Sequence, residues 1–346
     1  MIDKTYAMSS FLQFRTVYDP NIKFAKNLDY PRRDAPTYKD ERTQIDTWGE
    51  LHDYLKNVIE SVTADGKAAL ALSGGIDSAI CAKFMPEGST AYTFKCVVSD
   101  GDTIDETQKA EQCCSINRLK HCVVEINWDD YETYAPIIMR HKNAPIHSIE
   151  VQIYKAAMQA KQDGFSRLVF GASADIVFGG MDGLLSKDYL IGQYIDRFSF
   201  VLPYRVLKEF DLITAPFEKW TNNGIVDSHG FINDVYSSEL ANSYHNACTA
   251  ANIDVVDAYL PLRHIPIDIQ RIRNGDSKYI VRELYRSLYP DYEIPEKIPM
   301  PRPMEEWLNN WEGPKRPEFW PNCHKNMTGD QKYYIWILEK FLELFS

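Results

Sequence analysis

The sequence has no long apolar run, no cluster of basic residues and no paired cysteine motif. Because no stretch approaches the roughly 18 apolar residues that cross a bilayer, we expect no contact with a membrane. The formal net charge is −11 and lysine and arginine are scattered, which disfavours a nucleic-acid substrate. The seven cysteines form no Cys-x-x-Cys pair, and the adjacent Cys113 and Cys114 suit neither a disulfide nor a zinc site.

The start of the sequence also lacks the features of a secretory signal peptide. Together with the scattered cysteines, this predicts a reduced, cytoplasmic protein. Its 346 residues are 45% apolar, enough for one large or two ordinary domains with a sizeable core. The sequence does not indicate an oligomeric state.

Apolar segments alternate with helical patterns between residues 46 and 184. We predict strands over 68–72, 91–98, 121–126 and 167–170, and helices from Thr47, after residue 78, over 105–114 and over 148–163. This alternation predicts an α/β fold, a parallel sheet with helices on both faces, whose ligands bind beyond the carboxyl ends of the strands. Residues 1–45 are interpreted as an N-terminal arm or connector, and residues 185–346 as a mostly helical C-terminal part that completes the active site.

A glycine turn follows the first predicted strand, in the order Ser73-Gly74-Gly75-Ile76-Asp77-Ser78. Two adjacent glycines let the backbone approach a ligand closely, and the N–H groups of the turn and of the next helix attract phosphate. Asp77 is suited to the magnesium ion that accompanies a nucleotide. No Gly-Lys-Ser/Thr follows, so this is not a Walker loop. A plain strand-to-helix turn is the alternative interpretation.

Ser-Gly-Gly-x-Asp-Ser after a strand resembles the pyrophosphate loop of the N-type ATP pyrophosphatases. That superfamily includes asparagine, β-lactam, GMP and NAD synthetases and several tRNA-modifying enzymes. The resemblance implies an adenine nucleotide α-hydrolase-like fold that uses ATP and Mg²⁺. It also implies cleavage between the α and β phosphates, with AMP joined to an oxygen of the substrate.

A second loop, residues 171–181, follows the last predicted strand and should lie at the same sheet edge. It resembles the corresponding segment of asparagine synthetases and, in Ala174-Asp175-Ile176 and Gly179-Gly180-Met181, more closely that of β-lactam synthetases. The resemblance implies that Gly171 belongs to the ATP and pyrophosphate site. It also implies that Asp175 faces Asp77 across magnesium. Asp175 as a simple helix cap is the alternative.

A third segment resembles both families through Lys278-x-x-x-Arg282, then Lys297, and then Pro303 and Trp307-Leu308. By resemblance Lys297 is the catalytic lysine, which stabilises charge on the pentavalent phosphorus and on the tetrahedral intermediate. An exposed lysine in a proline-rich loop is the alternative.

The sequence departs from these families at two positions. Ile2 stands where asparagine synthetases have a catalytic cysteine, so we expect no glutamine hydrolysis by this chain. Ala172 stands where the relatives carry a glutamate or tyrosine that assists the nucleophile. A general base would then come from Glu239, Tyr244 or His245, or the nucleophile attacks without one.

The combined prediction is an ATP-dependent, AMP-forming carbon–nitrogen ligase. It would adenylate a small-molecule carboxylate, release pyrophosphate and pass the acyl group to an amine or to ammonia, supplied free or by a separate glutaminase. A tRNA-modifying ATP pyrophosphatase is one alternative. A nucleotide-binding homologue without catalysis, suggested by Ala172, is the other.

Overall fold

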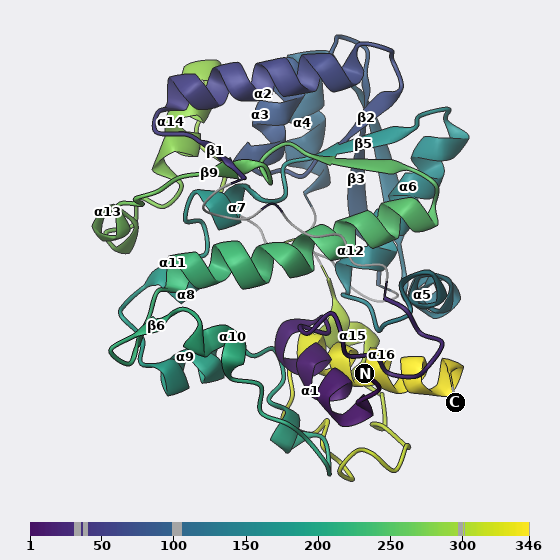
Figure 1. Cartoon of the computed structure of the whole chain (residues 1–346). Coiled ribbons are helices and arrows are strands. Elements are labelled where there is room, and N and C mark those ends of the chain that lie inside the picture. The colour runs from purple at the N-terminus through teal and green to yellow at the C-terminus, as the bar shows by residue number, and fades with distance from the viewer. Residues whose placement is uncertain (31–35, 37–40, 99–105, 297–299, 301, 346) are drawn as a thin grey trace.

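The computed structural model describes residues 1–30, 36, 41–98, 106–296, 300 and 302–345. Its centre is a five-stranded parallel sheet with the order β4-β3-β2-β5-β8 (Figure 1). The strands are β2 (Ala68–Ala71), β3 (Thr90–Cys96), β4 (Lys120–Ile126), β5 (Arg167–Phe170) and β8 (Asp254–Asp257). All four residues of β2 are buried, as expected for a central strand covered on both faces. The predicted α/β class with a parallel sheet is confirmed.

Helices cover both faces of this sheet. One group consists of α2 (Trp48–Thr63), α3 (Ile76–Phe84), α4 (Thr107–Asn117) and α14 (Tyr279–Leu288), and the other of α5 (Trp128–Lys142), α6 (Ile149–Gln162) and α12 (Ser237–Ala250). Helix α2 begins as the sequence predicts, with Thr47 and Glu50 forming a reciprocal capping box. In Figure 1, α2 runs along the top of the molecule and α12 across its middle.

The fifth strand, β8, lies in the part of the sequence where we predicted mainly helices. It pairs with β5 in parallel, from Arg167 opposite Asp254 to Phe170 opposite Asp257. Its sequence, Asp-Val-Val-Asp, is too short for a periodic signal and carries acidic residues at both ends. The strand is recognisable only through its partner, so this omission from the sequence prediction is corrected here.

The N-terminal segment also holds a helix that the sequence pattern did not reveal. Helix α1 (Lys4–Phe14) begins at Asp3, whose side chain accepts the backbone N–H of Tyr6, and it buries eight consecutive residues. It packs against the C-terminal helix α16 (Gly329–Leu344), with the rings of Phe11 and Tyr334 6.0 Å apart. In Figure 1 both helices lie below α12.

The remaining elements are short. They are β1 (Thr43–Gln44), α7 (Ala174–Val177), α8 (Asp182–Leu185), α9 (Ile191–Phe198), η1 (Pro203–Arg205), α10 (Ala215–Glu218), β6 (Thr221–Asn222), β7 (Ile225–Val226), α11 (Ser228–Phe231), the π-helical turn η2 (Ile232–Tyr236), β9 (Leu262–Arg263), α13 (Ile269–Arg273) and α15 (Met304–Trp307). An aromatic cluster that includes Tyr194, Phe198, Phe217 and Phe231 forms a second core beside the sheet. Among the described residues, no helix combines the length and apolar character needed to cross a membrane.

Candidate active site

The glycine turn is held closed by its two serines. The Ser73 backbone N–H donates to Ser78 Oγ over 3.1 Å, and the two hydroxyl oxygens lie 2.9 Å apart. Ser78 Oγ also lies 3.1 Å from the carbonyl oxygen of Ser73 and 3.2 Å from that of Gly75. Helix α3 begins directly after Gly75. The serines therefore shape the turn, while the N–H groups at the start of α3 are directed towards the sheet edge.

The second loop lies directly against the first. A Cβ atom at Gly171 would stand 2.9 Å from the carbonyl carbon of Asp77 and 3.0 Å from the nitrogen of Ser78. Since both neighbours are backbone atoms, only glycine allows this approach. A Cβ atom at Gly180 would overlap the carboxylate of Asp175. Glycines at both ends of the second loop thus make room for the two carboxylates to face each other.

Asp77 and Asp175 meet at the ammonium group of Lys278. Lys278 Nζ lies 2.7 Å from Asp77 Oδ2 and 2.9 Å from Asp175 Oδ1. Only 8% of the lysine side chain is exposed, against 18% for Asp77 and 25% for Asp175. Burial by itself lowers the pKa of Lys278, but the two carboxylates outweigh it, so the pKa is raised and the group stays charged.

These groups line a cavity of about 610 Å³ at the carboxyl end of the sheet. This volume lies in the range typical of small-molecule sites. Of the residues predicted for the site, Ser73, Gly75, Asp77, Ser78, Gly171 and Asp175 line it. Gly74 is packed behind the turn, because a Cβ atom there would stand 2.8 Å from Cβ of Lys109. Lys278 and Arg282 complete the wall from α14, four residues apart on one helix face.

Glu106 is a further carboxylate in this wall that sequence reasoning missed. It precedes α4, lines the cavity and is only 7% exposed. Burial raises its pKa, although the Gly74 backbone N–H and the charge of Lys109 act in the opposite direction. No pattern around Glu106 marks it in the sequence, since its role depends on α4 returning to the glycine turn.

The two aspartates fit a magnesium ion that arrives with a nucleotide. Magnesium in such sites takes one or two carboxylates, with phosphate oxygens and water as the other ligands. Within the described residues there is no group of three acidic, histidine or cysteine side chains that could hold a metal unaided. Asp77 and Asp175 already converge on one cation, Lys278.

The three candidate bases on α12 are placed differently from one another. Glu239 is buried and pairs with Arg15 at 2.8 Å, and it is not among the cavity-lining residues. His245 is half-buried on the same helix and is likewise outside the lining. Only Tyr244 lines the cavity, and burial raises the pKa of its phenol. Ala172 also lines the cavity.

Two charged interactions hold Glu239 away from base chemistry. Arg15 donates from Nη2 to Glu239 Oε2, and His147 Nδ1 lies 3.3 Å from Glu239 Oε1. Burial favours the protonated acid, but Arg15 and His147 prevail and lower the pKa of Glu239 to about 2. A carboxylate with such a pKa is a weak base. Glu239 instead joins the first helix of the chain to α12.

Lys297 lies outside the described residues. Its neighbours Pro295, Glu296 and Met300 line the cavity.

Asp257 is a second buried acid that the sequence analysis did not select. It ends β8, accepts the Ser173 hydroxyl at 2.5 Å and lies 3.1 Å from the backbone nitrogen of Tyr259. Tyr259 in turn donates its hydroxyl to the carbonyl oxygen of Asp77 at 3.3 Å. Asp257 thus ties the second loop to the first, and it was missed because β8 was missed.

Comparison with known proteins yields one family and two structural likenesses. The family model described as Asparagine synthase matches residues 50–264, more than half of the chain. An NH3-dependent NAD synthetase from Campylobacter jejuni subsp. jejuni NCTC 11168, in complex with the nitrate ion, is 15% identical over 39% of this chain and 61% of its own, with a TM-score of 0.26. An NMN synthetase from Francisella tularensis is 11% identical over 73% of this chain and 99% of its own, with a TM-score of 0.29. No curated protein matches the sequence. Only the family match bears on function, since both TM-scores are low.

Proposed function

Because this chain belongs to the asparagine synthase family, we propose that it is an ATP-dependent amide-forming ligase that releases AMP and pyrophosphate. A carboxylate substrate attacks the α phosphate of ATP, the bond between the α and β phosphates breaks, and pyrophosphate leaves. Ammonia or an amine then attacks the acyl carbon and displaces AMP. The observation that carries this proposal is the convergence of a phosphate-type turn, two carboxylates and a buried ammonium in one cavity.

The turn at residues 73–78 is suited to the β and γ phosphates. Its backbone N–H groups and the N-terminus of α3 provide donors without any charged side chain. Glu106 already engages the Gly74 N–H, so an incoming phosphate has to displace this carboxylate. Its raised pKa makes that easier, because the acid can be held in the neutral form beside an anion.

Asp77 and Asp175 would hold the magnesium ion, which supplies positive charge beside the phosphates. Lys278 supports the same function from the protein, since its ammonium lies in the cavity and is fixed by the two carboxylates. We assign Lys297 to the charge that develops on phosphorus, in line with its place in the third motif. Two cations from one segment of chain suit a reaction that expels pyrophosphate.

The nitrogen nucleophile meets Tyr244 rather than a carboxylate base. With its pKa raised, the phenol is protonated near neutral pH and acts as a hydrogen-bonding group. The neutral amine or ammonia therefore attacks without a strong base, and Ala172 leaves space where the relatives place a polar side chain.

The test is exchange of labelled pyrophosphate into ATP, with Mg²⁺ and a panel of carboxylic acids. Acid-dependent exchange, with AMP as the product when an amine is added, is the expected result. Formation of ADP would refute the adenylation mechanism, and nucleotide binding without exchange for any acid would refute catalysis. Lys297→Ala should abolish exchange, whereas Lys56→Met, at an exposed position on α2, should preserve it.

A further inference from the structure

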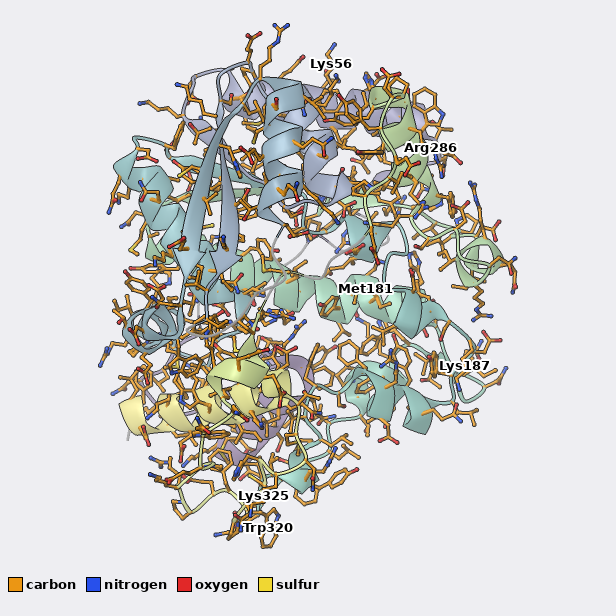
Figure 2. All side chains as sticks on the ribbon, turned by 180° about the vertical axis from the view of Figure 1, so that it is seen from behind. Lys56, Met181, Lys187, Arg286, Trp320 and Lys325 are labelled. Atoms are coloured by element: carbon orange, nitrogen blue, oxygen red, sulfur yellow. The ribbon has the colours of Figure 1, made fainter. Side chains whose placement is uncertain are left out.

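A second cavity of about 330 Å³ adjoins the nucleotide cavity. The two share Gly180 and Asp182, directly after the loop that carries Asp175. Its lining consists of Gly180, Met181, Asp182, Gly183, Leu184, Arg197, Phe198, Phe200 and Tyr236. Met181, labelled in Figure 2, lies near the middle of the molecule. A compound bound here would therefore reach the nucleotide cavity past residues 180–182.

Aromatic rings form one wall of this second cavity. Phe198 lies 5.8 Å from Phe200 and 6.2 Å from Tyr236, measured between ring centroids. The buried guanidinium of Arg15 stands over Phe200 at 3.7 Å and over Tyr236 at 5.0 Å. Because Arg15 is itself held by Glu239, the rings are supported from the side of α1 and α12. The wall is rigid and suits a flat or apolar group.

Arg197 brings a positive charge to the same cavity. It is the seventh residue of α9, and a Cβ atom at Gly183 would stand 2.5 Å from its Nη2 atom, so the guanidinium lies against the start of α8. Among the residues that the structure describes, no carboxylate forms an ion pair with Arg197. A guanidinium without a protein counter-ion is well suited to a carboxylate of a ligand, which it can bind through two parallel hydrogen bonds.

We propose that this second cavity binds the distal part of the acid substrate. That part carries a second anionic group, bound by Arg197, beside a flat or apolar body that packs on Phe198, Phe200 and Tyr236. The inference rests on the proposed ligase function for the reacting carboxyl, which would extend past Gly180 towards the nucleotide. Binding at a distance from the reacting atom holds that carboxyl in place for attack.

The first experiment measures binding with two matched acids, phenylsuccinate and 3-phenylpropionate, which differ by one carboxyl group. Isothermal titration should show at least about tenfold tighter binding of the diacid to the wild-type protein, from one charge-assisted contact. Arg197→Met should remove this preference and leave binding of 3-phenylpropionate unchanged. Lys187→Met, which removes an exposed positive charge outside the cavity lining, should retain the preference.

Gly183→Ala provides a variant that leaves Arg197 in place. Its new methyl group meets the guanidinium, so it should weaken diacid binding while the thermal midpoint stays near that of wild type. Equal binding of both acids, no binding of either, or an unchanged preference in Arg197→Met would each overturn the inference.

Pyrophosphate exchange separates this inference from the proposed function. Exchange supported by monoacids and diacids alike, in wild type and in Arg197→Met, would overturn the second anionic group and leave the ligase function intact. Arg197-dependent binding of phenylsuccinate without exchange for any acid would refute the ligase function and retain the binding site.

Discussion

Replacing Lys278 with methionine tests how the centre of the site is held together. The substitution removes the ammonium that lies 2.7 Å from Asp77 and 2.9 Å from Asp175, and it leaves the aliphatic volume nearly unchanged. Two carboxylates then face each other without the cation. We expect the folded state to lose stability and the site to gain affinity for a divalent metal.

The magnitude follows from burial. Removing one partner of a fully buried ion pair costs about 3–5 kcal/mol, because the remaining charge is left without compensation. Here the carboxylates are 18% and 25% exposed and can recover part of their hydration. We therefore expect Lys278→Met to lower the free energy of unfolding by about 2–3 kcal/mol.

The sign of the pH dependence is fixed by the raised pKa of Lys278. A lysine whose folded pKa exceeds its unfolded value stabilises the protein fully below the unfolded pKa of about 10.4. This contribution is lost only as the pH rises towards the folded pKa. The stability difference between wild type and Lys278→Met should therefore be constant in this respect from neutral pH to about pH 10 and shrink above it.

Urea denaturation with and without Mg²⁺ measures both effects. Magnesium should stabilise Lys278→Met more than wild type, because in the variant it meets two carboxylates with no competing ammonium. Lys56→Met is the control for loss of a lysine at an exposed site. A Lys278→Met protein within about 0.5 kcal/mol of wild type, with the same response to Mg²⁺, would refute the reasoning.

Three further predictions concern the supports of the site. Gly171→Ala should cost about 1–3 kcal/mol and impair exchange, since its Cβ meets the backbone of Asp77, and thermal melts would measure it against Gly192→Ala, which has open space. Glu239→Gln should destabilise the protein by about 3–5 kcal/mol at pH 7 but, once corrected for the folded fraction, leave kcat unchanged. The folded pKa of Glu239 is about 2, so its contribution is complete above the unfolded value of about 4.3 and lost as the pH falls towards 2, which acid titration would follow. Asp257→Asn should lower kcat in acid-dependent exchange more than it raises KM for ATP, because it loosens the loop at Ser173.

Each of these predictions has an outcome that contradicts it. Equal melting of the two glycine variants would mean that the loops are not in backbone contact. A large loss of kcat in folded Glu239→Gln would restore that residue as a base. Wild-type kcat in Asp257→Asn would separate β8 from the chemistry, provided that the variant melts as wild type does.

Much of the sheet and part of the cavity could be predicted from the sequence, because their signals are local. The apolar run before Ser73, the adjacent glycines and the helix that follows lie within twenty residues of one another. Steric and hydrogen-bonding rules act over that range, so the turn can be recognised before any folding is known. The capping box at Thr47 is predictable for the same reason.

The tertiary structure decided which charges meet. Lys278 lies 201 residues after Asp77, and Arg15 lies 224 residues before Glu239, so neither pairing leaves a pattern in the chain. Strand β8 is identified only by its alignment with β5, and Asp257 gains its role through that alignment. Charge interactions depend on distance and burial in space, which separation along the sequence does not specify. The residue types capable of the chemistry are visible in the sequence, whereas folding determines which of them face one cavity and which of them neutralise each other in the core.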